Sequence, residues 1–303
     1  MGGTDFSKKI LQKLRMSAEF RRMKKIILLI TALAAAMFVG CASQNQNVVK
    51  QPRKVGVQMY SLNRFTFEDA IAKLKGLDID GIECYGSQKL SKKYPNARTD
   101  YKLNAEERAY MKKLLKDAGL KMVSYGVTRA NSEEEVDKVC QFVKEMGGER
   151  VLTEAPVCFW PAWDKACAKY GLTMLIHHHS TKDAPFWDTD YFKRHVKGFK
   201  HIKYNPDPGH WTRSGLDPVK CLKSVDGYVA GTHFKDLKQG GEFGKIPCKN
   251  VPAPYGEGII DVKGMLAEFD RQGFDGFFMI EYEGEWDNNI PQIKKCIEFL
   301  RHN

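Results

Sequence analysis

From residue 54 to the end of the chain, short apolar runs alternate with stretches in which apolar positions recur every three to four residues. The runs are typical of buried strands, and the stretches with helical spacing are typical of amphipathic helices. The predicted strands cover residues 55–60, 81–85, 121–126, 150–154, 172–177, 201–205, 228–235 and 277–281. The predicted helices lie near 67–77, 104–118, 132–146, a stretch ending at 170, 190–196, 218–224, 262–272 and 291–300.

This alternation of strand and helix predicts a parallel sheet covered by helices. Eight such units between residues 54 and 303 match the size of a closed (β/α)8 barrel. The alternative is an open, doubly wound sheet, but no glycine-rich loop opens the first helix. We therefore expect one α/β domain, a TIM barrel, over residues 54–303.

The segment before the barrel is basic and then apolar. Ile26–Gly40 carries no charge, and as a helix it would rise about 22 Å, less than the roughly 30 Å of a bilayer core. We therefore interpret residues 1–40 as a signal peptide, whose true start could be Met23. Small residues before Cys41 resemble the lipobox of bacterial lipoproteins, with a lipidated Cys41 and a linker over 41–53.

This reading predicts a protein that is lipid-anchored to a membrane of a bacterial cell envelope, on its periplasmic or surface-facing side. The alternatives are an ordinary secretory peptide or a signal anchor, in which Cys41 is an incidental thiol. The remaining seven cysteines form no CxxC pair and are odd in number, so neither a disulfide framework nor a zinc knuckle is indicated.

The 303 residues have a formal charge of +11, which by itself would suggest a nucleic-acid partner. Residues 1–40 supply +6 of this charge, and the other 263 residues carry only +5. More than half of the net positive charge therefore lies in the predicted signal peptide, and we expect no nucleic-acid partner. The sequence leaves the oligomeric state open, a homo-oligomer included.

Ionisable side chains stand at the ends of the last five predicted strands. They are Glu154, His177 to His179, Asp207, His233 with Lys235, and Glu281. In a TIM barrel the carboxyl ends of all strands meet at one face, where active sites form. We therefore expect these side chains to gather at the mouth of the barrel. Taken singly, each could instead be a salt-bridged or capping group.

Three of these side chains are carboxylates, and together in one cleft they would repel each other. A divalent cation held by Glu154, Asp207, His233 and Glu281 removes that repulsion. Three oxygens and one imidazole nitrogen suit Mn²⁺ or Mg²⁺, with Co²⁺ or Zn²⁺ as alternatives. Glu83, at the end of the second strand, could reach a substrate, but a salt bridge explains it equally well.

Several motifs in this order resemble the sugar phosphate isomerase/epimerase family of xylose isomerase-like TIM barrels. The matching segments are Thr153-Glu154-Ala155-Pro156, His177-x-His179, Asp207-Pro208-Gly209-His210-Trp211, Ser214-Gly215-Leu216-Asp217-Pro218, His233-Phe234-Lys235-Asp236, Tyr255-Gly256-Glu257-Gly258 and Ile280-Glu281-Tyr282-Glu283. The resemblance implies the same four metal ligands that strand position suggests. It also implies that Glu154 and Glu281 are catalytic and exchange a proton through a metal-stabilised enediolate.

The resemblance further implies that His179, His210, Lys235 and, less directly, His177 bind the substrate. Three departures bear on substrate identity, and the first is the short segment between Glu154 and Gly171. The fifth strand ends in His177-His178-His179, where many relatives have an acidic or amide residue, and Asn205-Pro206 precedes Asp207. Strand alternation turns His178 away from His177, so we interpret His178 as structural.

We therefore expect a divalent-metal-dependent sugar isomerase or epimerase that acts on a keto-sugar or related carbohydrate. An unphosphorylated sugar, such as an oxidised glycoside or an inositol derivative, is favoured because phosphorylated sugars are chiefly cytoplasmic. A lyase or dehydratase could use the same enediolate. The remaining alternatives are a carbohydrate-binding lipoprotein without turnover and an apurinic-site endonuclease, whose zinc cluster needs more imidazoles than are placed here.

Overall fold

The computed structural model of the chain describes residues 52–243, 246–247 and 249–303. The predicted signal peptide, Met23, Cys41 and most of the linker lie outside the described residues. Within them, no helix combines the length and the apolar character that a membrane crossing requires.

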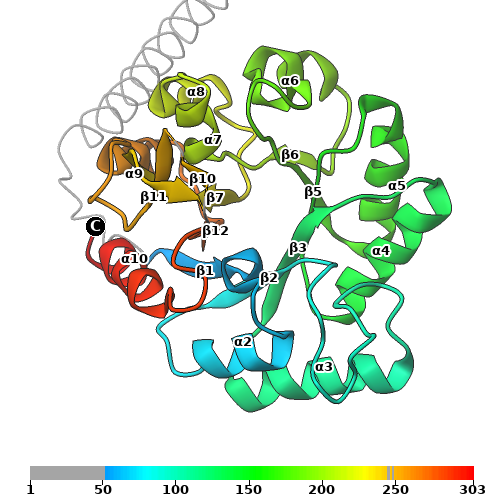
Figure 1. Cartoon of the computed structure of the whole chain (residues 1–303). Coiled ribbons are helices and arrows are strands. Elements are labelled where there is room, and N and C mark those ends of the chain that lie inside the picture. Colours follow the sequence, from blue (N-terminus) through cyan, green and yellow to red (C-terminus); the bar gives the residue numbers. More distant parts are fainter. Residues whose placement is uncertain (1–51, 244–245, 248) are drawn as a thin grey trace, which may run out of the picture. The chain divides into compact units, whose positions relative to one another are not determined.

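The described residues form a sheet of eight parallel strands that curls into a barrel (Figure 1). The strands are β1 (Lys54–Gln58), β2 (Gly81–Cys84), β3 (Met122–Thr128), β4 (Arg150–Thr153), β5 (Thr173–Ile176), β6 (Ile202–Tyr204), β7 (Thr232–Phe234) and β12 (Phe277–Ile280). Their spatial order is β6-β5-β4-β3-β2-β1-β12-β7. A parallel bridge from Tyr204 to Val229, just before β7, joins the two ends of this order. The expected TIM barrel is confirmed, and the open sheet is excluded.

Helices surround the barrel on its outside (Figure 1). They are α2 (Phe67–Leu74), α3 (Ala105–Ala118), α4 (Glu133–Glu145), α5 (Trp160–Tyr170), α6 (Thr189–His195), α7 (Pro208–Arg213), α8 (Pro218–Ser224), α9 (Val262–Arg271) and α10 (Ile290–His302). In α4 the buried residues Val136, Val139, Cys140 and Val143 recur at helical spacing, which places one apolar face against the sheet. Short 3₁₀ turns occupy Met59–Leu62, Val157–Phe159 and Pro185–Trp187.

Local signals explain where several helices begin and end. The Asn104 side chain accepts a hydrogen bond from the backbone of Glu107, whose carboxylate bonds back to the Asn104 backbone. This capping box starts α3 at the position that its sequence spacing predicts. Gly119 and Gly171 adopt φ angles of 69° and 65° at the ends of α3 and α5, a conformation that glycine adopts without steric cost.

The segments after β6 and β7 differ from the expected pattern. After β6 the chain forms the short helix α7, which the sequence pattern did not predict; it begins at Pro208 and is capped by Asp207. The expected strand 228–235 is shortened to β7, and the chain then forms the antiparallel pair β8 (Asp236–Gln239) and β11 (Asn250–Ala253). A second antiparallel pair joins β9 (Glu242–Phe243) and β10 (Ile246–Pro247).

Buried Asp236 anchors the loop that returns from β11. Its carboxylate accepts hydrogen bonds from the backbone N–H groups of Gly256, Gly258 and Ile260 at 2.9, 3.0 and 3.2 Å. The Tyr255 hydroxyl donates to the carbonyl of Phe234 at 2.6 Å. These bonds fix the loop beside the mouth of the barrel, so the Gly256 and Gly258 motif serves loop geometry.

Candidate active site

In the described chain, four side chains of the types that bind metal ions, from successive strand ends, meet at the mouth of the barrel. His177 follows β5, Asp207 follows β6, His233 lies on β7 and Glu281 follows β12. One ligand atom from each lies within 4.8 Å of the others. All four are buried, with side-chain exposures of 2, 0, 1 and 8%. We refer to these four residues as the buried cluster.

One polar atom of each residue in the buried cluster forms no hydrogen bond among the described residues, although each of these atoms lies in ion-pair contact with Lys235 or with another of the four. These atoms are His177 Nε2, Asp207 Oδ2, His233 Nδ1 and Glu281 Oε2, one from each residue. Buried polar atoms nearly always form hydrogen bonds, and four that form none at one point call for an explanation. Imidazole nitrogens and carboxylate oxygens are common ligands of divalent cations. The cluster can therefore hold a metal ion.

The side chain of Lys235 lies among these carboxylates. Its Nζ is 3.0 Å from Asp207 Oδ2, 2.9 Å from Glu281 Oε2 and 3.3 Å from Glu283 Oε2. Burial alone would lower the pKa of Lys235, but the three carboxylates outweigh it and raise that pKa. Burial alone would likewise raise the pKa of Asp207 and of Glu281, but nearby cations, Lys235 first among them, lower both. The site therefore holds ionised carboxylates next to a fixed ammonium group.

A second carboxylate orients the imidazole of His233. Glu83 Oε1 lies 2.6 Å from His233 Nε2, and the Ser124 hydroxyl donates to Glu83 Oε2 at 2.6 Å. On the other side of the ring, Nδ1 lies 3.0 Å from Glu281 Oε2. Burial would lower the pKa of His233, but Glu83 and Glu281 raise it to about 10. Glu83 thus fixes the ring with Nδ1 toward the buried cluster.

Glu154 lies beside the buried cluster and is connected to it through His177. Its Oε1 is 2.9 Å from His177 Nδ1 and 2.5 Å from His179 Nδ1. Burial would raise the pKa of Glu154, but the hydrogen bonds to His177 and His179 lower it well below its usual range. Glu154, His177 and His179 form a second group of ligand atoms within 4.8 Å. His177 therefore occupies the place among the four that strand position assigned to Glu154.

Two further histidines support Asp207. The ring of His178 stacks on Trp211 with centroids 4.7 Å apart, and its Nε2 accepts a hydrogen bond from the Asp207 backbone at 3.0 Å. Burial lowers the pKa of His178 to about 3, so the ring is neutral and acts as an acceptor. His210 Nε2 lies 3.7 Å from Asp207 Oδ2, and burial lowers the pKa of His210 to about 2.

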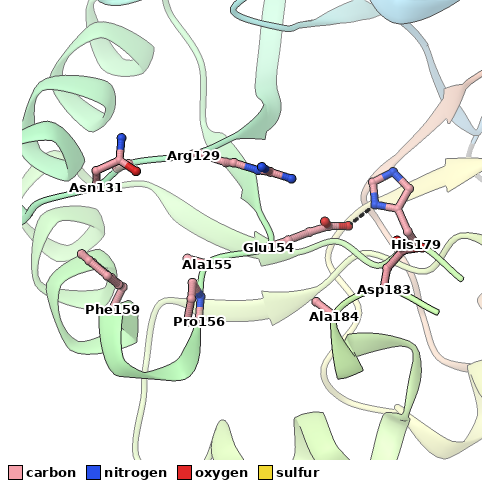
Figure 2. Close-up of a pocket in the computed structure, with 10 residues that line it drawn as sticks. Arg129, Asn131, Glu154, Ala155, Pro156, Phe159, His179, Asp183 and Ala184 are labelled. Carbon is pink, nitrogen blue, oxygen red and sulfur yellow. Dashed lines mark hydrogen bonds and ion pairs between the residues drawn. The ribbon is translucent and has the colours of Figure 1, made fainter. Parts of the chain in front are cut away.

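A hollow of about 610 Å³ opens beside this site, and Figure 2 shows the side chains around it. It is formed by the loops after β3, β4 and β5, and Glu154 and His179 stand at its inner edge. The lining residues are Arg129, Ala130, Asn131, Glu154, Ala155, Pro156, Phe159, His179, Asp183 and Ala184. We refer to this hollow as the side pocket.

The closed barrel and the polar cluster at its carboxyl end define a TIM barrel of the enzyme type. Residues 71–303 match the family described as the xylose isomerase-like TIM barrel, and the chain belongs to that family. The expected family resemblance is thus confirmed.

Comparisons with individual proteins agree with this assignment. The chain is 27% identical over 111 residues to the L-ribulose-5-phosphate 3-epimerase UlaE of Salmonella paratyphi C (strain RKS4594). That alignment covers 34% of this chain and 36% of the epimerase, so the chain spans little more than a third of that relative.

Among solved structures, an uncharacterized protein from Parabacteroides distasonis is 27% identical, with a TM-score of 0.66 over 82% of this chain and 98% of its own. A xylose isomerase-like TIM barrel protein from Mycobacterium smegmatis, in complex with magnesium, shares the fold at 13% identity. Its TM-score is 0.64, over 82% of this chain and 96% of its own. Both structures agree with the xylose isomerase-like TIM barrel that the family match shows.

Proposed function

We propose that this protein is a divalent-metal-dependent isomerase or epimerase that moves a proton on a keto-sugar. The observation that carries the proposal is the set of four buried ligand atoms, two from histidines and two from carboxylates, that lie within 4.8 Å of one another at the mouth of the barrel. Family membership supports the reaction class, and the Salmonella relative is named as a sugar epimerase.

The residues that would hold the cation are His177, Asp207, His233 and Glu281, with Glu154 next to them. We still predict Mn²⁺ or Mg²⁺. Co²⁺ and Zn²⁺ are the alternatives, because imidazole ligands also suit them. When bound, the cation would polarise a substrate carbonyl and thereby acidify the neighbouring C–H bond.

The chain itself supplies the groups that carry the proton. Glu154 and Glu281 are ionised, since their pKa values are both lowered, and each can accept a proton from carbon. Glu154 stands at the edge of the side pocket, and Glu281 belongs to the buried cluster. A sugar carbon between them would be accessible to one carboxylate on each side, so that one removes the proton and the other returns it.

Three cationic or neutral donors lie where they would contact substrate oxygens. Lys235 Nζ is within 3.3 Å of the carboxylates of Asp207, Glu281 and Glu283. If Asp207 and Glu281 served as ligands of a bound cation, the Lys235 ammonium group beside them could donate to a developing oxyanion. His179, whose side chain is 43% exposed, and His210 would bind sugar hydroxyl groups.

The cellular place of this activity is a separate part of the proposal. The apolar run that ends at Cys41 supports a lipid anchor in a bacterial cell envelope. An enzyme held there would act on an unphosphorylated sugar.

Solvent exchange tests the proposed reaction directly. The purified protein is incubated in D₂O with Mn²⁺ and a panel of ketoses, and the recovered sugars are analysed by mass spectrometry and NMR. We expect deuterium at the carbon next to the carbonyl, and we expect EDTA and the variant Glu281→Gln to abolish it. Sugars recovered without deuterium, from protein that has bound Mn²⁺, would refute the proposed proton transfer.

A further inference from the structure

The side pocket lies to one side of the buried cluster. Of the catalytic and metal-ligand candidates, Glu154 lines it, and none of the four cluster residues does. In Figure 2 the Glu154 and His179 side chains meet at one end, while Phe159 and Asn131 lie at the other. A molecule whose reacting carbon lies next to Glu154 would therefore extend into this space with its non-reacting part.

The lining combines an apolar wall with polar groups at its rim. The wall consists of alanine, proline and phenylalanine side chains, namely Ala130, Ala155, Pro156, Phe159 and Ala184. Arg129 and Asn131 provide hydrogen-bond donors, and one N–H of the Asn131 amide already donates to Glu135 Oε2 at 3.2 Å. Sugar rings have C–H faces that pack on such a wall and hydroxyl edges that need such donors.

Arg129 has donors available for a ligand. Its guanidinium makes no hydrogen bond or ion pair with the part of the chain that the structure describes, and its side chain extends across the side pocket toward Glu154 (Figure 2). A guanidinium group offers five N–H donors in one plane, which suits neighbouring hydroxyl oxygens on a sugar ring.

The side pocket is larger than the space that one sugar ring occupies. Its volume of about 610 Å³ lies within the roughly 300–1,000 Å³ of pockets that take drug-sized ligands. A disaccharide is a molecule of that size, whereas a single hexose is much smaller. Space for a second ring is therefore present next to the reacting position.

We propose that the substrate is a keto-sugar that carries a second sugar residue, and that the side pocket binds this second residue. The inference rests on the proposed function, since it places the reacting ring between Glu154 and the buried cluster. Phe159 and Pro156 pack against the second ring, and Arg129 and Asn131 donate hydrogen bonds to its hydroxyl groups. The side pocket thus selects disaccharide-sized substrates over free ketoses.

Calorimetric titration of the Mn²⁺-loaded protein tests this assignment. The probes are the ketose disaccharides maltulose, lactulose and isomaltulose, and D-fructose is the monosaccharide control. We expect at least one disaccharide to bind about tenfold or more tightly than fructose. Arg129→Ala and Phe159→Ala should each remove this difference and leave the affinity for fructose unchanged. Asn131→Ala, a third variant at an exposed position, should have the same effect.

Two results would overturn the inference, and they are distinguishable. Equal affinity for fructose and all three disaccharides would overturn the proposed role of the side pocket alone. Variants that weaken the binding of fructose and of the disaccharides alike would do the same. No binding of any of these sugars and no deuterium exchange would overturn the proposed function and the side pocket together. A Tm equal to that of the wild-type protein establishes that the fold of each variant is intact.

Discussion

At the scale of single residues, the site depends on a carboxylate that is not itself one of the proposed metal ligands. Glu83 on β2 and His233 on β7 are 150 residues apart in the chain, yet their side chains meet at 2.6 Å. Because Glu83 occupies Nε2, only Nδ1 of His233 can face the buried cluster. Such outer partners of metal-binding histidines commonly set the ring orientation and the ligand strength.

We predict that Glu83→Gln weakens Mn²⁺ binding by about 10- to 100-fold, as loss of such partners does elsewhere. The amide keeps the size of the side chain but removes the charge that makes His233 a stronger ligand. Calorimetry of Mn²⁺ binding gives the affinity. The matched control is Glu257→Gln, a half-exposed carboxylate paired with Lys295, which should leave the affinity unchanged. If Glu83→Gln binds Mn²⁺ as tightly as Glu257→Gln does, Glu83 does not support the metal site.

At the scale of elements, α7 and the buried cluster share one residue. Asp207 Oδ1 accepts the backbone N–H of His210 at 2.9 Å and so caps the first turn of α7. Its other oxygen, Oδ2, belongs to the ligand atoms of the buried cluster and lies 3.0 Å from Lys235 Nζ. The helix thereby holds the carboxylate in one orientation, and any change at Asp207 acts on both the helix and the site.

A pair of substitutions separates these two roles. We predict that Asp207→Asn and Asp207→Ala both abolish Mn²⁺ binding, because both remove the anionic ligand. The free energy of unfolding of Asp207→Ala should be about 1 kcal/mol lower than that of Asp207→Asn, because only asparagine retains the helix cap. Urea denaturation of the metal-free proteins measures the difference. Variants of equal stability would mean that the cap contributes nothing to the fold.

At the scale of the whole molecule, the cluster ligands come from β5, β6, β7 and β12, so a bound cation would link four strands of the barrel. A ligand that binds only the folded state stabilises it by about 2.7 kcal/mol at one hundred times its Kd. For a domain of this size, each kcal/mol corresponds to roughly 2–4 °C in Tm.

We therefore predict that saturating Mn²⁺ raises the Tm of the barrel by about 5–10 °C, and that EDTA reverses the shift. Differential scanning calorimetry measures it. Asp207→Asn serves as the control, since it lacks a ligand of the cluster and should show no shift. A rise of the same size in that variant would place the stabilising ion elsewhere on the protein.

Much of the architecture follows from local pattern. Apolar periodicity predicted the barrel strands and most helices because each must bury one face, and Asn104 and Gly119 mark the ends of α3 through short-range bonds. Helix α7 was missed although Asp207 followed by Pro208 is a recognisable start signal. The β8–β11 pair was missed because residues 236–253 mix charged, glycine and apolar positions without a clear period.

The sequence by itself determined that Asp207, His233 and Glu281 would stand at one end of a barrel, because parallel strands present their carboxyl ends together. Tertiary structure alone decided which groups touch there. The rotamer of His177 places its ring between Glu154 and Asp207, and it makes His177 the fourth member of the buried cluster. The pairing of Glu83 with His233 and the position of Lys235 likewise depend on closure of the barrel, since those contacts join residues far apart in the chain.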